Sequence, residues 1–266
     1  DALNLTTGGA TLTATANNNI AVNANITTNA AAVTLSGLNV TVSGGVTVTA
    51  TTNTVTADDF VLTGNISSSA NTVLQPLTQD RALRLGAADN LGDASVEISD
   101  AELDRLIGTG TRLELGSNAA ANRFGTVAVE GAIDPATAAL ANLRIFASGA
   151  VTQTAGSTIT SPHLVIDGQA AITLTEANEA TNFNATTTNG NIQYTDATAL
   201  DTGLDTAFAA NFERGVFATN GGITLIANGE LDMNNTGLAT DYSATNGITF
   251  QTSANNMVRV RNNATV

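Results

Sequence analysis

The sequence predicts an all-β fold, a right-handed parallel β-helix (solenoid), from three observations. Short runs with an apolar residue at every second position follow one another, such as ATLTATA (Ala10 to Ala16) and IAVNANI (Ile20 to Ile26). This period is that of a half-buried strand. The spacers between these runs, as at 17–19 and 44–45, are very short. Similar patterns also recur at a nearly constant distance along the chain.

The recurrence distance favours stacked coils. Leu12, Val33 and Thr54 begin similar patterns roughly 20 residues apart, and GGITLIANGELDM (Gly221 to Met233) is followed by the similar NGITFQTSANNMV (Asn246 to Val258) about 25 residues later. One coil cannot bury its own inner face, whereas a stack of coils buries it continuously. Uniform coils of about 20 residues would give about 13 coils and a rod roughly 60 Å long.

A hairpin-rich sandwich is the alternative architecture. Asn-Gly occurs at 189–190, 220–221, 228–229 and 246–247, and Asp-Gly at 167–168. These dipeptides are typical of tight hairpin turns, so the second half of the chain leaves hairpins open. The short spacers exclude a fold in which strands alternate with crossover helices.

Composition limits both the core and the function. The chain has 44 threonines and 30 asparagines but only 4% aromatic residues, so Val, Ile, Leu and Ala must form the core. The absence of cysteine excludes disulfides and thiol nucleophiles. With a net charge of −14 and nine basic residues, all arginine, the chain is predicted to bind no nucleic acid. No apolar run is long enough to predict membrane insertion.

A first short helical insertion is predicted near 99–108. Ser99 and Glu102 have the spacing of a capping box, in which each side chain accepts from the backbone amide of the other. Three apolar residues that follow fall on one helical face, and Gly108 is expected to end the helix.

A second helical insertion is predicted near 201–213. Leu204, Phe208 and Phe212 recur at every fourth position, which indicates a loop with a short helix over the outside of the solenoid. The pair Asp134-Pro135 also predicts about one helical turn that runs to Leu140.

Five segments carry a family resemblance: LTQDRALRLG (Leu77 to Gly86), VEISDAELDRLIGTGTRLELGS (Val96 to Ser117), GTVAVEGAID (Gly125 to Asp134), LRIFASGAVTQTAGSTIT (Leu143 to Thr160) and LVIDGQAAITLTEANEATNF (Leu164 to Phe183). Over about half of the chain, they resemble the filamentous-haemagglutinin-like large exoproteins of Gram-negative bacteria. The resemblance implies a β-helical passenger, secreted through an outer-membrane pore, that lies outside the cell or on its outer surface. The family's N-terminal secretion domain, with its Asn-Pro motifs, is not found in this sequence.

The chain is predicted to form a single β-helix segment over 1–266, as part of a longer polypeptide or a polymer. Both ends, at 1–5 and 258–261, resemble strands without a polar cap, and such edges pair with further strands. The expected partners are therefore the chain itself, head-to-tail or within a longer chain, and the surface of a host or neighbouring cell.

Three functions are predicted, and they are given in decreasing order of support from the sequence. The first is a structural or adhesive extracellular stalk, and the second is a subunit of a self-assembling filament joined through the solenoid ends. The third and least favoured is a polysaccharide-cleaving enzyme, so the chain is predicted not to be an enzyme. No catalytic, cofactor-binding or metal-binding residue is assigned, and no cofactor is expected.

Several residues are considered for sites, and none is assigned to one. The single histidine, His163, follows Ser161-Pro162 and is interpreted as a turn residue. The carboxylate groups considered for acid–base catalysis are Asp58-Asp59, Asp100/Glu102/Asp104 and Asp196/Asp201/Asp205. The groups considered for calcium are Asp89-Asn90 with Asp93, and Asp232-Asn234-Asn235, both interpreted as solvated turns.

Overall fold

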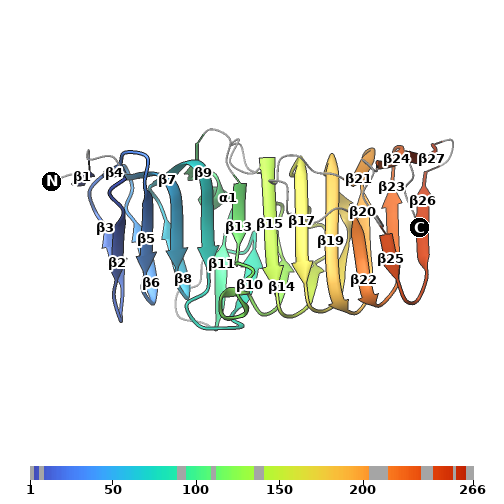
Figure 1. The fold of residues 1–266 in the computed structure, drawn as a ribbon, viewed down its shortest axis with the longest axis horizontal. Helices are drawn as coiled ribbons and strands as arrows, with labels where there is room; N and C mark the ends of the chain where they lie inside the picture. The colour runs from blue at the N-terminus through green and yellow to red at the C-terminus, as the bar shows by residue number, and fades with distance from the viewer. Residues whose placement is uncertain are drawn as a thin grey trace.

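The computed structural model describes residues 3–5, 9–88, 94–108, 112–134, 141–203, 215–234, 242–253 and 256–261. Within these residues, the strands of three parallel sheets stack along one axis, with the N-terminus at one end of an elongated molecule and the C-terminus at the other (Figure 1). Every strand pairing is parallel, from β1 with β4 at one end to β24 with β27 at the other. The predicted all-β parallel β-helix is confirmed.

The described strands belong to three sheets. The long sheet contains β1 (Leu3–Leu5), β2 (Leu12–Thr15), β4 (Ile26–Thr28), β5 (Ala32–Ser36), β7 (Thr47–Thr56), β9 (Asn65–Gln75), β12 (Leu106–Ile107), β13 (Arg112–Leu115), β15 (Asn142–Ala147), β17 (His163–Gly168), β19 (Asn182–Asn189), β21 (Leu200–Gly203), β22 (Val216–Asn220), β24 (Leu231–Asn234), β25 (Tyr242–Ala244) and β27 (Val258–Arg261). The eight-stranded sheet contains β10 (Ala82–Leu85), β11 (Ser95–Ile98), β14 (Val127–Val129), β16 (Val151–Gln153), β18 (Ile172–Asn178), β20 (Ile192–Asp196), β23 (Ile223–Ala227) and β26 (Ile248–Thr252). The three-stranded sheet contains β3 (Ile20–Val22), β6 (Asn39–Val42) and β8 (Asp59–Leu62).

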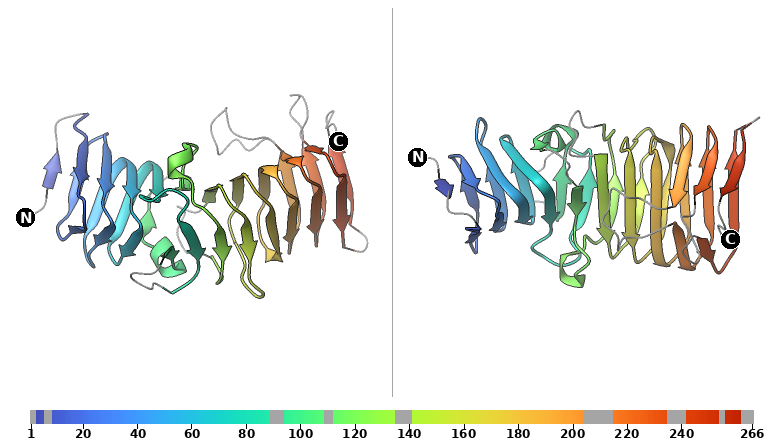
Figure 2. Two further views of the ribbon diagram at one scale, coloured as in Figure 1. Left: turned by 90° about the horizontal axis from the view of Figure 1, so that it is seen from below. Right: turned by 45° about the horizontal axis from the view of Figure 1, so that its top comes forward.

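The coil period read from the sequence is confirmed in the regular coils. Leu12 lies beside Val33 and Val33 beside Asn53, so the first coils repeat after 21 and 20 residues. Ile223 lies beside Ile248, which is the predicted 25-residue repeat near the C-terminus. The two further views show the strands continuing from coil to coil along the axis (Figure 2).

The predicted rod length is too large because the coils are not uniform. Thr72 pairs with Leu113, a step of 41 residues, and Leu113 pairs with Leu143, a step of 30 residues. The path through the long sheet from β1 to β27 has ten steps, which at about 4.8 Å each give a length near 48 Å. The residues inserted in these steps lengthen the coils without adding a layer to the long sheet.

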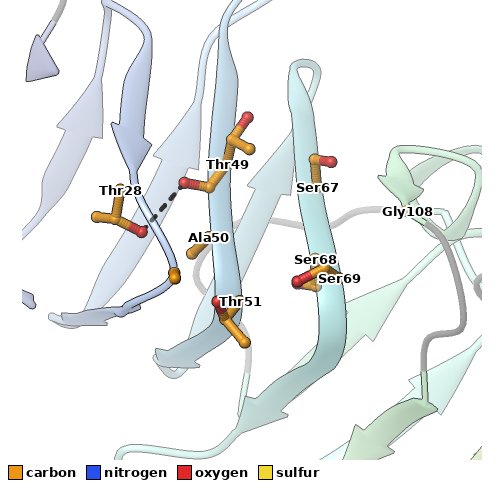
Figure 3. Close-up of a pocket in the computed structure, with 9 residues that line it drawn as sticks. Thr28, Thr49, Ala50, Thr51, Ser67, Ser68, Ser69 and Gly108 are labelled. Atoms are coloured by element: carbon orange, nitrogen blue, oxygen red, sulfur yellow. Dashed lines mark hydrogen bonds between the residues drawn. The ribbon is translucent and has the colours of Figure 1, made fainter. Parts of the chain in front are cut away.

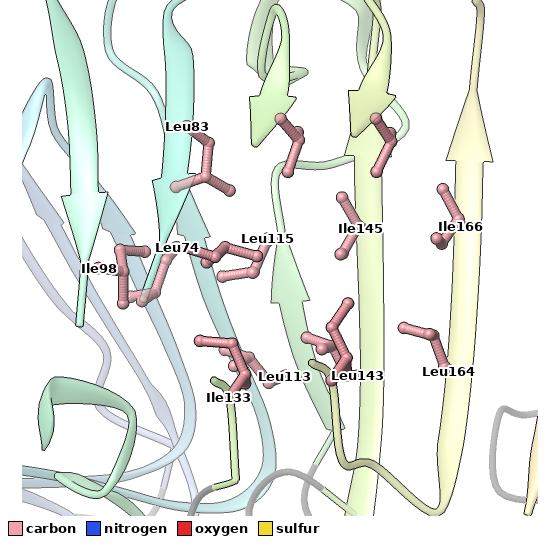
Figure 4. Packing of buried hydrophobic residues seen from close by; sticks show 14 of the residues in the cluster. Leu74, Leu83, Ile98, Leu113, Leu115, Ile133, Leu143, Ile145, Leu164 and Ile166 are labelled. Carbon is pink, nitrogen blue, oxygen red and sulfur yellow. The ribbon is translucent and has the colours of Figure 1, made fainter. Parts of the chain in front are cut away.

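The core is a column of aliphatic side chains enclosed by the sheets. Along β13 and its neighbours, every second residue points inward, and Leu113, Leu143 and Leu164 stack on one another in successive coils (Figure 4). All three are no more than 1% exposed, and burying one such side chain contributes roughly 1.5–3 kcal/mol. One core cluster extends from Val22 to Tyr242.

The predicted insertion near 99–108 is present but is shorter than expected. Helix α1 (Asp100–Leu103) has the capping box, in which Ser99 accepts from the amide of Glu102 and the Glu102 carboxylate accepts from the amide of Ser99. The helix ends at Leu103, because the chain then enters β12, where Leu106 pairs with Ile66. Gly108 therefore follows a strand and does not end the helix. A 3₁₀ turn, η1 (Ala120–Asn122), lies in the next coil.

The second predicted insertion lies mostly outside the described residues. Its first part, 201–203, belongs to strand β21, whereas 204–213 is not described. The helical turn expected after Asp134 also lies outside the described residues.

The Asn-Gly pairs form corners of coils and not hairpins. Gly190 and Gly247 have positive φ values of 103° and 96°, a conformation that glycine adopts readily. The turns at 189–190 and 220–221 stack on each other. The amide of Gly190 donates to Asn220 O at 3.2 Å, and the Asn220 side chain donates to Asn189 Oδ1 at 3.0 Å. Asn-Gly turns thus connect parallel strands of successive coils here. The hairpin-rich sandwich is therefore excluded.

One step in the stack runs against the order of the chain. In the eight-stranded sheet, β10 lies between β11 and β14, although it precedes both in sequence. The chain therefore places β10 one layer ahead and returns to place β11 beneath it. The extra strand accounts for part of the 41-residue coil.

Candidate functional site

The acidic pair Asp58-Asp59 has a structural role. Both side chains are buried, and the Asp58 carboxylate accepts from the amide of Thr78 at 2.6 Å and from its hydroxyl at 2.5 Å. These bonds fix the start of the inserted segment that leads to β10. A carboxylate engaged in this way does not face an open groove.

The second acidic group stabilises α1, as expected from the capping box. One Glu102 oxygen accepts from the amide and hydroxyl of Ser99, both at 3.0 Å. The other oxygen accepts from the amide of Leu62 in strand β8 at 3.1 Å. Asp100 accepts from the amide of Asp134 at 2.9 Å. These carboxylates link the helix to neighbouring coils.

Asp196 is more deeply buried than Asp201, the other described member of the third acidic group. It is 1% exposed, and its oxygens accept from the amides of Ala180 and Thr198, each at 2.8 Å, and from the Tyr194 hydroxyl at 2.9 Å. Burial of the phenol and then the Asp196 carboxylate raise the pKa of Tyr194 well above its ordinary value near 10. The Tyr194 ring stacks on Phe183 at a centroid distance of 3.9 Å.

Asp201 does not lie with Asp196 but stacks on the outer side of a different sheet. Asp201 pairs with Asp232, and Asp232 with Arg259, in successive strands β21, β24 and β27. Glu230 forms an ion pair with Arg259 beside them. Arg259 therefore lies at the end of a row of stacked aspartates formed by Asp201 and Asp232. Asp205, Asp89, Asn90, Asp93 and Asn235 lie outside the described residues.

His163 is the first residue of strand β17 and not a turn residue. It stacks between Asn142 and Asn182 of the neighbouring strands. Its carbonyl accepts from the Ser161 hydroxyl at 3.1 Å. Among the residues that the structure describes, no group of three or more His, Asp or Glu side chains could hold a metal ion.

A shallow groove of about 360 Å³ is lined by hydroxyls and small residues. It crosses the bends of β7 and β9, where Thr49 to Thr51 and Ser67 to Ser69 lie on adjacent coils (Figure 3). Thr28 contributes the next coil and donates to the carbonyl of Thr49 at 3.4 Å. At the far side, a side chain on Gly108 would meet the carbonyl oxygen of Ser68 at 1.8 Å. The lining carries no charge, so it offers hydrogen bonds but no acid–base group.

An ion cluster lies on the outer face of the eight-stranded sheet. Arg84 of β10 donates to Glu130 at 2.7 Å and to Glu97 at 3.3 Å. The hydrogen bond with Glu130 is the main reason why the pKa of Arg84 is raised above its ordinary value. Since Arg84 is about a third exposed, the pair contributes little to stability.

A second ion cluster is buried on the outer face of the long sheet. Asp167 contacts Arg123 at 2.9 Å and Arg144 at 3.4 Å. Both guanidinium groups lie over the Phe146 ring, at 5.5 and 4.3 Å from its centroid. Sequence reasoning did not identify this cluster, although all of its β-strand members occupy outward positions.

Compared with protein-family models, with curated proteins and with solved structures, the chain gives no match. Among the described residues, none of the helices has the length and hydropathy needed to cross a bilayer.

Proposed function

We propose that the chain is a structural and adhesive stalk segment of a secreted or cell-surface protein, exposed outside a Gram-negative bacterium. The observation that carries the proposal is the continuous stack from β1 to β27, which shares one core. Each coil adds one layer of hydrogen bonds and one layer of aliphatic side chains, so length increases by simple addition. The sequence resemblance to filamentous-haemagglutinin-like exoproteins supports the extracellular setting.

The chemistry of the acidic groups also favours a structural role over catalysis. Asp58, Glu102 and Asp196 accept hydrogen bonds from backbone amides within the stack. A glycoside-cleaving pair needs two carboxyl groups that converge across a substrate groove. These three carboxylates belong to separate coils and serve separate local contacts.

Electron microscopy of the purified chain over a concentration series tests the proposal. We expect discrete rods about 48 Å long at every concentration. Uniform fibres that lengthen with concentration would contradict the stalk and favour the filament subunit. Particles without an elongated shape would contradict both.

A deletion of one whole coil gives a matched test of additive length. Since Ala32 pairs with Thr52, removal of 32–51 leaves the flanking strands in register. We expect a folded rod shorter by about 4.8 Å in small-angle X-ray scattering. Removal of 32–41 alone is the control, because half a coil destroys the register and should unfold the surrounding coils. Unfolding by both deletions would argue against a modular stalk.

Adhesion is tested separately with coated beads on layers of bacterial or epithelial cells under flow. We expect more beads to be retained with the chain than with serum albumin. Equal retention would remove the adhesive part of the proposal and leave the structural part.

A further inference from the structure

A polar pocket of about 530 Å³ lies at the corner where strands of the long sheet turn into the eight-stranded sheet. Its polar lining comes from Gln79, Asp80, Arg123, Thr126, Ser148 and Gln169. We propose that this pocket binds a neutral carbohydrate. The inference goes beyond the structural part of the proposed function, whose length and assembly need no ligand, and it names a ligand class for the adhesive part.

Stacked turns bring these distant residues together. The amide of Gly125 donates to Arg81 O at 2.8 Å, and the amide of Gly149 donates to Gly125 O at 2.9 Å. Gln169 continues the stack by donating from its amide to Ala147 O at 3.1 Å. The pocket is thus built on hydrogen-bonded corners of successive coils, which fix its shape.

Two glycines keep the floor of the pocket free of side chains. A Cβ atom on Gly125 would lie 2.1 Å from Asp80 O, and one on Gly149 would lie 3.0 Å from the Gly125 carbonyl carbon. Because the backbones touch, larger residues do not fit there. Asp80 itself has a positive φ of 59°, a sparsely populated conformation for a residue with a side chain.

The charges in the pocket favour a neutral ligand. Arg123 is 5% exposed, and its Nη2 donates to the Asp167 carboxylate at 2.9 Å and to Asn118 Oδ1 at 3.0 Å. Arg123 is therefore paired within the protein, with a carboxylate that it shares with Arg144. The exposed Asp80 carboxylate would repel an acidic ligand.

The remaining groups match the hydroxyls of a sugar, each of which both donates and accepts. Asp80 is an acceptor and Ser148 donates to it at 2.5 Å, while the exposed amides of Gln79 and Gln169 supply donors and acceptors on both sides. Beyond Gln169, the same corner continues with the exposed Asn189. An oligosaccharide can therefore extend from the pocket parallel to the rod axis.

The test uses the full chain and a panel of neutral hexasaccharides: cellohexaose, chitohexaose, maltohexaose and mannohexaose. Binding is measured by saturation-transfer NMR and then by calorimetry. The variants Gln169→Ala and Ser148→Ala remove pocket groups, whereas Gln193→Ala, on the outer face of β20 and outside the pocket, is the control. Circular dichroism checks that each variant folds. A heparin hexasaccharide provides the acidic comparison.

We expect at least one neutral hexasaccharide to bind, with affinity reduced about tenfold by each pocket variant and unchanged by Gln193→Ala. The proposal is overturned if none of the four binds. It is equally overturned if heparin binds in preference, or if the pocket variants bind as well as the control.

Discussion

The backbone amide of Leu62 donates to Oε1 of Glu102 at 3.1 Å, although 40 residues separate the two in sequence. Leu62 ends β8, the last strand of the three-stranded sheet. The second oxygen of Glu102 accepts from Ser99 at the start of α1. One carboxylate therefore caps a helix and also supplies an acceptor at the edge of a sheet, where no further strand of that sheet follows within the described residues.

Replacing Glu102 by Ala should lower the free energy of unfolding by about 2–3 kcal/mol, because two amides lose their acceptor. Glu102→Gln keeps an oxygen for one of them and should lose less. Urea denaturation measures both. Glu179→Ala, at an exposed position, is the control and should stay within about 0.5 kcal/mol of wild type. Equal stability of Glu102→Ala and the control would show that the carboxylate is dispensable.

Asp167 should be more important than either arginine that it contacts. Asp167→Ala leaves Arg123 and Arg144 buried without that carboxylate, so we expect a loss of about 3–5 kcal/mol. Arg144→Met leaves the Arg123–Asp167 pair in place and should lose less. In a double-mutant cycle, Arg144→Met with Asp167→Ala should destabilise by less than the sum of the single changes. Additive losses would contradict a coupled cluster.

Gly108→Ala should destabilise the fold at the hydroxyl-lined groove that crosses β7 and β9. The new Cβ would lie 1.8 Å from the Ser68 carbonyl oxygen, at a φ of 147°, which we expect to cost about 1–3 kcal/mol. Gly44→Ala is a matched control, because its nearest contact is at 3.9 Å and its φ is not positive. Thermal unfolding followed by circular dichroism compares the two. A similar melting temperature for both would refute the close packing at this groove.

Alkaline pH should destabilise the fold through Tyr194. Its pKa is raised in the folded state, so its contribution is complete below the unfolded value near 10 and is lost as pH rises through the folded value. We expect the melting temperature to fall above pH about 10, and to fall less steeply in Tyr194→Phe. Tyrosinate absorbance measured in parallel should show that ionisation accompanies unfolding. Ionisation at pH 10 without any loss of stability would contradict this account.

Alternation in the sequence was sufficient to predict the strands and much of the register. Inward Leu12 and Val33 stack as predicted, as do Ile223 and Ile248, because a two-residue period directly reports which side chains face the core. The capping box at Ser99 was also readable, since its chemistry is local.

Other features depend on contacts between coils that local patterns do not report. Alternation places Arg144 and Asp167 outward, yet it does not say that their outer face is buried. The reversed order of β10 and β11 depends on which edges meet in space. The polar pocket joins Asp80, Ser148 and Gln169 from separate coils, and the intervals between these residues follow no motif.

Because the coils differ in length, the length of the molecule along its axis is not proportional to its number of residues. The step from Asn53 to Thr72 uses 19 residues and the next step, to Leu113, uses 41, but each raises the stack by the same strand spacing of about 4.8 Å. A corner can therefore gain a helix or lose a loop while the distance between the two ends stays constant. The surface at the corners can therefore change without any change in the end-to-end length of the molecule.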